Sequence, residues 1–212
     1  MSKKKEIVIL GGGQAAAYAA KEIRLIDNHS NLTMITEEEV LPYERPPLSK
    51  DYLLNKVEFE KCLFFSQSYY DENNINCIKN EKIKVVDFEK KRLSSIKNNY
   101  YNYDKLLIAT GSKNKKLEIN GLDLDDDKII YLRNIKESKE IKDKIKVAKN
   151  ITIIGGGFIG LEIASSANQM NKDVTVLERT NQLMGRVVPT QISKVIQDLH
   201  EKNGNKIHLD IA

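Results

Sequence analysis

The chain has 212 residues, 41% of them hydrophobic, and can bury the core of one large or two small domains. Its net charge of +4, from 34 basic and 30 acidic residues, lacks the clustered basic excess of a nucleic-acid-binding protein. No apolar run approaches the roughly 18 residues that a membrane span needs. We therefore expect a cytoplasmic protein with neither nucleic acid nor membrane as a partner.

Cysteine and histidine are too sparse to indicate a metal centre. Cys62 and Cys77 lack the spacing of a redox pair, a disulfide framework or a zinc site. The three histidines, His29, His200 and His208, are scattered along the chain without ligand spacing. We expect all five side chains to have packing or surface roles, and we expect no metal site.

The first elements predict a β-α-β unit. Residues 6–10 (EIVIL) have the pattern of a strand, residues 15–26 carry apolar side chains at helical spacing, and residues 32–36 form a second strand-like run. Because the helix returns the chain to the same edge of the sheet, the two strands are expected to be parallel.

The middle of the chain departs from this pattern. Residues 41–54 (LPYERPPLSKDYLL) contain paired prolines, which favour the first turn of a short helix. A further helix is expected near residues 66–73, followed by short strands at 75–78, 82–88 and 92–96. We interpret these three strands as a small antiparallel insertion in an α/β domain.

A second β-α-β unit begins at residue 150, where ITIIGGGFIGLEIASSANQM is followed by DVTVLE. The lysine-rich helix predicted before it, over residues 136–149, interleaves both charges and therefore indicates a solvated face. Another helix is expected from about residue 189, and residues 206–211 begin a further strand.

Both β-α-β units carry a glycine motif at the end of the first strand. Gly11-x-Gly13-x-x-Ala16 has the spacing for a tight turn, close approach of a pyrophosphate, and packing of the helix on the sheet. The helix N-terminus offers free N–H groups to phosphates. Glu37, or its neighbour Glu38, is the candidate for the ribose hydroxyls. Alone, this motif fits equally a glycine-rich turn that binds no dinucleotide.

The second copy removes that ambiguity. Gly155-x-Gly157-x-x-Gly160 opens the second helix, and Glu178 ends the following strand 23 positions after Gly155. Two motifs predict that the protein binds two dinucleotides. A nicotinamide delivers a hydride in one step, whereas a flavin can accept the hydride and release the electrons one at a time, so the two together would form an electron relay. Glu178 favours NADH over NADPH, whereas the adjacent Arg179 could bind a 2′-phosphate.

Several motifs resemble the FAD-dependent pyridine nucleotide oxidoreductase family, and within it the ferredoxin reductase branch of putidaredoxin and rhodocoxin reductases. They are PYERPPLSK at 42–50, ATG at 109–111, YLR at 131–133, GGGFIGLE at 155–162 and RVVP at 186–189. The resemblance covers the chain and implies an α/β fold with two Rossmann-like units. It further implies an FAD-binding domain, first segment 1–115, into which an NAD-binding domain, 116–212 and incomplete, is inserted.

The resemblance also implies site residues. FAD contacts are expected from Gly11, Gly13, Gln14, Ala15, Ala16, Glu37, Arg45, Lys50, Ala109, Thr110, Gly111 and Arg133, and from Ile83 by strand position alone. NADH contacts are expected from Gly155, Gly157, Phe158, Ile159, Gly160, Glu162, Glu178 and Arg179.

Lys50 and Glu162 are the candidate catalytic residues, which the resemblance places beside the flavin ring. Independently, a fixed ammonium group stabilises negative charge as it develops on a flavin. The alternative interpretations are an ordinary exposed lysine on a short helix and a first-turn glutamate favoured by the helix dipole.

The expected electron acceptor is an iron–sulfur ferredoxin that serves an oxygenase. Disulfide reductases of this superfamily carry a CxxxxC pair where this chain has RPPLSK, so electrons are expected to leave the flavin directly. Alternatives are a monodehydroascorbate reductase-like or NADH oxidase-like flavoenzyme, or a redox interaction protein like apoptosis-inducing factor. Relatives continue beyond the position of Ala212, and we expect the chain to be an N-terminal fragment of a longer reductase.

Overall fold

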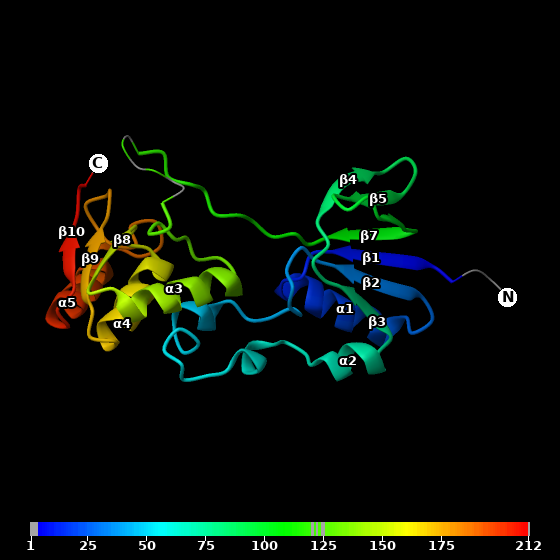
Figure 1. Cartoon of the computed structure of the whole chain (residues 1–212), viewed down its shortest axis with the longest axis horizontal. Coiled ribbons are helices and arrows are strands. Elements are labelled where there is room, and N and C mark those ends of the chain that lie inside the picture. The colour runs from blue at the N-terminus through cyan, green and yellow to red at the C-terminus, as the bar shows by residue number, and fades with distance from the viewer. Residues whose placement is uncertain (1–3, 120, 122, 124–125, 212) are drawn as a thin grey trace. The chain divides into compact units, whose positions relative to one another are not determined.

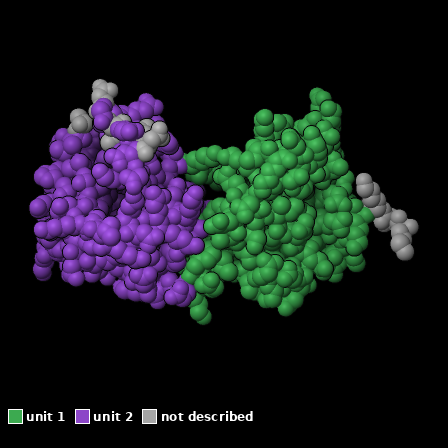
Figure 2. Space-filling view, viewed as in Figure 1, with its two compact units in different colours: residues 1–44, 59–113 green, residues 45–58, 114–212 purple. Residues whose placement is uncertain are grey.

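The computed structural model describes residues 4–119, 121, 123 and 126–211. The chain forms two compact units, shown in Figure 2. The first unit comprises Met1–Glu44 and Phe59–Lys113, and the second comprises Arg45–Glu58 and Asn114–Ala212. The proline-containing segment therefore packs with the second half of the chain, although its sequence neighbours on both sides belong to the first unit.

The first unit contains a four-stranded sheet in the order β3-β2-β1-β7, in which every neighbouring pair is parallel. Helix α1 (Gln14–Ile26) connects β1 to β2, which confirms the predicted parallel β-α-β unit. The strands are β1 (Glu6–Leu10), β2 (Asn31–Ile35), β3 (Ile75–Ile78) and β7 (Lys105–Ile108).

The prediction that residues 75–78 belong to an antiparallel insertion is wrong, because β3 pairs in parallel with β2. Helix α2 (Gln67–Glu72) returns the chain to the same edge of the sheet, and Tyr70 and Ile75 are buried in the core there. The antiparallel sheet consists of β4 (Ile83–Asp87), β5 (Arg92–Ser95) and β6 (Tyr100–Asn102).

Alternate side chains of β1 face opposite sides of the parallel sheet, as the two-residue period of a strand requires. Ile9 packs in a core cluster with Ala16 and Ala20 of α1, whereas Val8 packs with Leu93 of β5. The sheet is thus covered by helices on one face and by the antiparallel sheet on the other (Figure 1).

The second unit contains a parallel three-stranded sheet in the order β10-β9-β8. Its strands are β8 (Asn150–Ile154), β9 (Asp173–Leu177) and β10 (Lys206–His208), connected by α4 (Phe158–Gln169) and α5 (Thr190–Lys202). This arrangement confirms the second β-α-β unit. The last strand ends at His208, earlier than residue 211, and Asp210 adopts a positive φ of 55°.

Two further helical elements complete the second unit. Helix α3 (Ile135–Val147) begins with a capping box in which Asn134 accepts from the Glu137 backbone N–H and Glu137 accepts from that of Asn134. The paired prolines do begin a short helix, the 3₁₀ turn η1 (Pro46–Ser49), which lies between α3 and α4. A second 3₁₀ turn, η2 (Phe59–Cys62), belongs to the first unit. Within the described ranges, no helix has the length and apolar character needed to cross a bilayer.

Candidate functional site

The glycine loop of the first unit lies tightly between the ends of two strands. A Cβ built on Gly11, whose φ is +132°, would lie 2.1 Å from the carbonyl oxygen of Ala109 after β7. A Cβ on Gly12 would lie 2.5 Å from Oγ1 of Thr36 after β2. Gly13 differs, because nothing lies within 4 Å of its Cβ position.

The loop of the second unit is also crowded at its middle glycine and open at the second glycine of its motif. A Cβ on Gly156 would lie 2.5 Å from Cδ2 of Leu183, and one on Gly160 would lie 2.1 Å from the carbonyl oxygen of Gly155. Gly157 faces open space within the same 4 Å limit. Gly155 itself has a φ of +107°, a conformation that favours glycine.

The second glycine is thus a position in both motifs at which no protein atom fills the space a side chain would take, and in the second unit Gly155 shares this property. Gly13 and Gly157 are also the N-cap residues of α1 and α4, and neither helix start has a side-chain cap. Backbone N–H groups and the positive end of the helix dipole face this space. Both loops consequently fit the phosphates of a dinucleotide.

Carboxylates follow the second strand of each unit. In the first unit Glu37 is exposed, with Oε2 3.3 Å from Nζ of Lys82, whereas Glu38 accepts a hydrogen bond of 2.7 Å from the Tyr43 hydroxyl. Tyr43 is buried, so this hydrogen bond holds the Glu38 carboxylate against the protein surface. Of the two candidates, Glu37 is the carboxylate that faces solvent.

Glu178 occupies the corresponding place in the second unit. Its Oε2 accepts from the Gly156 backbone N–H at 2.7 Å, and its Oε1 accepts from the backbone and hydroxyl of Thr180 at 2.8 and 2.9 Å. Partial burial raises the pKa of Glu178, but these hydrogen bonds outweigh it and the net pKa lies below the usual value. An ionised carboxylate thus lies beside the glycine loop, while Arg179 is exposed.

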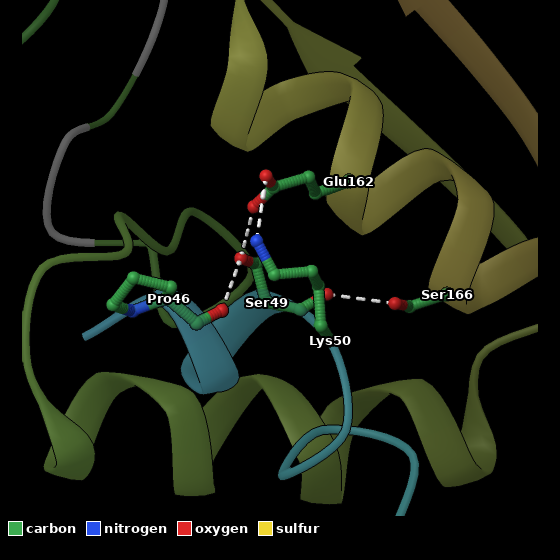
Figure 3. A network of polar contacts seen from close by, with 5 residues as sticks. All are labelled: Pro46, Ser49, Lys50, Glu162 and Ser166. Atoms are coloured by element: carbon green, nitrogen blue, oxygen red, sulfur yellow. Dashed lines mark hydrogen bonds and ion pairs between the residues drawn. The ribbon is translucent and has the colours of Figure 1, made fainter. Parts of the chain in front are cut away.

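Lys50 and Glu162 meet in the second unit, as Figure 3 shows. Nζ of Lys50 lies 2.8 Å from Oε1 of Glu162, although the residues are 112 positions apart. Lys50 follows the last residue of η1, and Glu162 lies in the second turn of α4. Their side chains are 46% and 29% exposed, so the pair is accessible to a ligand. The hydroxyl of Ser49 donates to the other carboxylate oxygen of Glu162 at 2.5 Å.

Two arginines extend this site. Nη1 of Arg45 donates to the carbonyl of Arg133 at 2.5 Å, and the backbone N–H of Arg133 donates to Glu137, the N3 residue of the capping box of α3. A pocket of about 250 Å³ is lined by these groups and by apolar side chains. It brings together six predicted site residues, which are Arg45, Lys50, Arg133, Phe158, Ile159 and Glu162.

The other predicted residues lie elsewhere. Gln14 and Ala15 are exposed on the first turn of α1, Ala16 is fully buried behind them, and Thr110 and Gly111 are exposed after β7. Ile83, on β4, packs partly buried against the core of the first unit. The sequence did not indicate Ser138 and Ser166, two buried serines that bind the backbone of η1, because isolated helical serines carry no pattern.

Two β-α-β units with glycine loops at their strand ends are the architecture of proteins that bind dinucleotides. A family model for pyridine nucleotide-disulphide oxidoreductases matches residues 5–212, and the chain belongs to this family.

Two curated relatives and one solved structure give more specific comparisons. The chain is 32% identical to a rubredoxin-NAD(+) reductase of Ectopseudomonas oleovorans, over 96% of the chain and 52% of that protein. It is 36% identical to a monodehydroascorbate reductase of Cucumis sativus, over 93% of the chain and 49% of that protein. A ferredoxin reductase structure from Rhodopseudomonas palustris is 30% identical, with a TM-score of 0.91 over 97% of the chain and 50% of that structure. The chain spans about half the length of the curated relatives it matches.

Proposed function

We propose that this chain belongs to an NADH-dependent flavoprotein reductase that passes electrons to a small iron–sulfur protein of the ferredoxin type, the electron donor of an oxygenase. The observation that carries the proposal is the combination of two open glycine loops with the Lys50–Glu162 pair, which lines an accessible pocket. Relatives named for rubredoxin and ferredoxin reduction support this class of acceptor.

Each cofactor is proposed to bind the glycine loop of one β-α-β unit. The loop at Gly11, Gly13, Gln14 and Ala15, with Glu37 and the Ala109–Gly111 turn, would hold FAD through its phosphates and ribose. The loop from Gly155 to Gly160, with Glu178, would hold NADH. Arg45, Lys50 and Arg133 are proposed as further flavin contacts, and 1–115 and 116–212 remain the proposed limits of the FAD and NAD domains.

Lys50 and Glu162 are the proposed catalytic pair. FAD, when bound, would supply the redox chemistry that takes a hydride from NADH and passes electrons on one at a time. The Lys50 ammonium would provide a fixed positive charge that stabilises the negative charge developing on the flavin as the hydride arrives. Glu162 holds that ammonium in place through Oε1, while its own Oε2 is held by Ser49. The orientation of Lys50 is thus established before a ligand enters.

Rapid mixing of the FAD-loaded protein with NADH in the absence of oxygen tests the proposal. We expect fast loss of the oxidised flavin absorbance, followed by reduction of an added ferredoxin. A protein that binds both nucleotides yet leaves the flavin oxidised would exclude the proposed reaction. We also propose a cytoplasmic location, and fractionation of the cells that produce the protein tests it.

A second candidate is a flavoenzyme that reduces a small organic radical, which the 36% identity to a monodehydroascorbate reductase favours. The reduced protein separates the two candidates when it is offered each acceptor in turn. Faster electron transfer to monodehydroascorbate than to ferredoxin or rubredoxin would favour the second candidate.

A further inference from the structure

The turn that carries Lys50 ends with two buried carbonyl groups. Leu48 and Ser49 are 1% and 3% exposed, and they form the last two positions of η1. The final carbonyls of a helix have no partner within it, and a buried carbonyl without a hydrogen bond is costly. Donors from outside η1 must therefore satisfy them.

Two serine hydroxyls provide these donors. Oγ of Ser138 on α3 donates to the carbonyl of Leu48 at 2.7 Å, and Oγ of Ser166 on α4 donates to the carbonyl of Ser49 at 2.7 Å. Both serines are buried, at 0% and 2% exposure. The backbone immediately before Lys50 is thus tied to two different helices at two successive carbonyls.

Ser49 also contacts two consecutive turns of α4 (Figure 3). Its hydroxyl donates to Glu162 and its carbonyl accepts from Ser166, and these partners are four residues apart on one helix face. The hydroxyl lies 3.3 Å from the Pro46 carbonyl as well, but it has one proton, and the carboxylate at 2.5 Å is the stronger acceptor. Oε1 of Glu162 therefore remains for Lys50.

The ion pair alone is too exposed to impose this geometry. Surface pairs of long side chains contribute little because solvent screens them and the lysine loses rotamer freedom. The hydrogen bonds from Ser138 on α3 and Ser166 on α4 instead restrain the backbone of residues 48–49, which leads directly into Lys50.

We propose that Ser166 and Ser138 are positioning residues that hold the backbone of residues 48–49 between α4 and α3, so that Lys50 stays paired with Glu162. This inference rests on the proposed function for its catalytic consequence, but the geometry it describes is independent of any cofactor. A purely structural role predicts a loss of stability alone, whereas a positioning role also predicts a change at the Lys50 ammonium.

The Lys50 ammonium can be observed directly by NMR of protein labelled with ¹⁵N-lysine. Loss of one signal in Lys50→Arg assigns it, and its shift in Glu162→Gln marks the position of the unpaired ammonium. In Ser166→Ala we expect the Lys50 signal to move toward the Glu162→Gln position. Ser166→Thr, which keeps the hydroxyl, should leave the signal near its original place.

Ser193→Ala is the matched control, because Ser193 is also a buried serine of the second unit, at 2% exposure, but it lies on α5. It should leave the Lys50 signal unchanged. If a folded Ser166→Ala protein keeps the original Lys50 signal, the proposal is wrong. Should Ser166→Ala fail to fold, Ser138→Ala gives the same test at the neighbouring carbonyl, and an unmoved signal there also overturns it.

The FAD-loaded protein gives a second readout. Misplacement of a catalytic group by about 1 Å can reduce a rate by about 10²-fold, so Ser166→Ala should lower kcat by about 10-fold to 10²-fold with little change in the KM for NADH. A moved NMR signal with an unchanged kcat would leave the positioning intact and count against the proposed function of Lys50. An unmoved signal would overturn the positioning whatever the activity.

Discussion

Oε2 of Glu178 accepts a hydrogen bond of 2.7 Å from the backbone N–H of Gly156, and this contact joins the end of β9 to the glycine loop after β8. The loop approaches closely here, since a Cβ on Gly156 would lie 3.3 Å from that of Glu178. One carboxylate thus orders the loop and places a negative charge beside the proposed NADH ribose.

The first prediction is that Glu178 stabilises the fold at neutral pH and loses this effect in acid. The pKa of Glu178 in the folded protein lies below its ordinary value of 4.5, so its ionised form stabilises the fold above about pH 4.5. This contribution is lost as the pH falls through the lowered pKa. We expect the free energy of unfolding of Glu178→Gln to be lower than that of the wild type at neutral pH and to converge with it in acid. Chemical denaturation along a pH series measures this, and a constant difference would contradict it.

The second prediction is a preference for NADH over NADPH. A 2′-phosphate about 4 Å from the Glu178 carboxylate meets a repulsion of about 4 kcal/mol at an intermediate dielectric. A third of that gives roughly tenfold discrimination. Comparison of kcat/KM for the two nucleotides decides the matter. Equal values would mean that Arg179 binds the phosphate, and Glu178→Ala should narrow the difference.

The third prediction distinguishes two glycines of one motif, Gly157 at the N-cap of α4 and Gly160 inside that helix. Gly157→Ala should leave the fold stable, because its Cβ enters open space, yet it should weaken NADH binding by occupying the phosphate position. Gly160→Ala should instead destabilise the second unit by about 1–3 kcal/mol, since its Cβ meets the Gly155 carbonyl at 2.1 Å. Calorimetric titration with NADH and thermal unfolding measure the two effects. Unimpaired binding by Gly157→Ala would argue against phosphates at this loop.

The fourth prediction concerns Lys50 in the FAD-loaded protein. Lys50→Met removes the ammonium that lies 2.8 Å from Glu162 and keeps a side chain of similar length. Loss of one oriented charge at a developing anion reduces rates by about 10²-fold to 10³-fold. Stopped-flow reduction by NADH checks this. A rate equal to that of the wild type, in a folded protein, would assign the pair a structural role only.

The fifth prediction is that the cysteines are dispensable. Cys62 is buried, and burial raises the pKa of the Cys77 thiol from 9.0 to about 12. Alkylation of Cys77 near pH 8 should be about 10³-fold slower than that of an unperturbed thiol, because the thiolate is the reactive form. The double change to Ser should keep electron transfer to ferredoxin. A flavin-loaded double variant that accepts hydride but cannot reduce ferredoxin would show a redox role.

The sequence alone predicts the two β-α-β units because the information is local. Strand, glycine turn and helix follow one another within one stretch, and their periods of 2 and 3.6 residues are visible in the hydrophobic pattern. For the same reason the spacing of Gly11 and Gly13, and of Gly155 and Gly157, was sufficient to predict the loops that the structure contains.

Contacts between distant residues required the tertiary structure. No period relates Lys50 to Glu162, 112 positions apart, and only the family resemblance placed them together. The contacts of Ser138 and Ser166 could not be predicted, because a serine in a helix can point to solvent as readily as to a neighbouring carbonyl. The four residues of β3 were predicted to lie in the wrong sheet. The pairing partner of so short a strand depends on which core its side chains can join. Ile75 packs in the same core cluster as Tyr70, a contact that exists only in the folded chain.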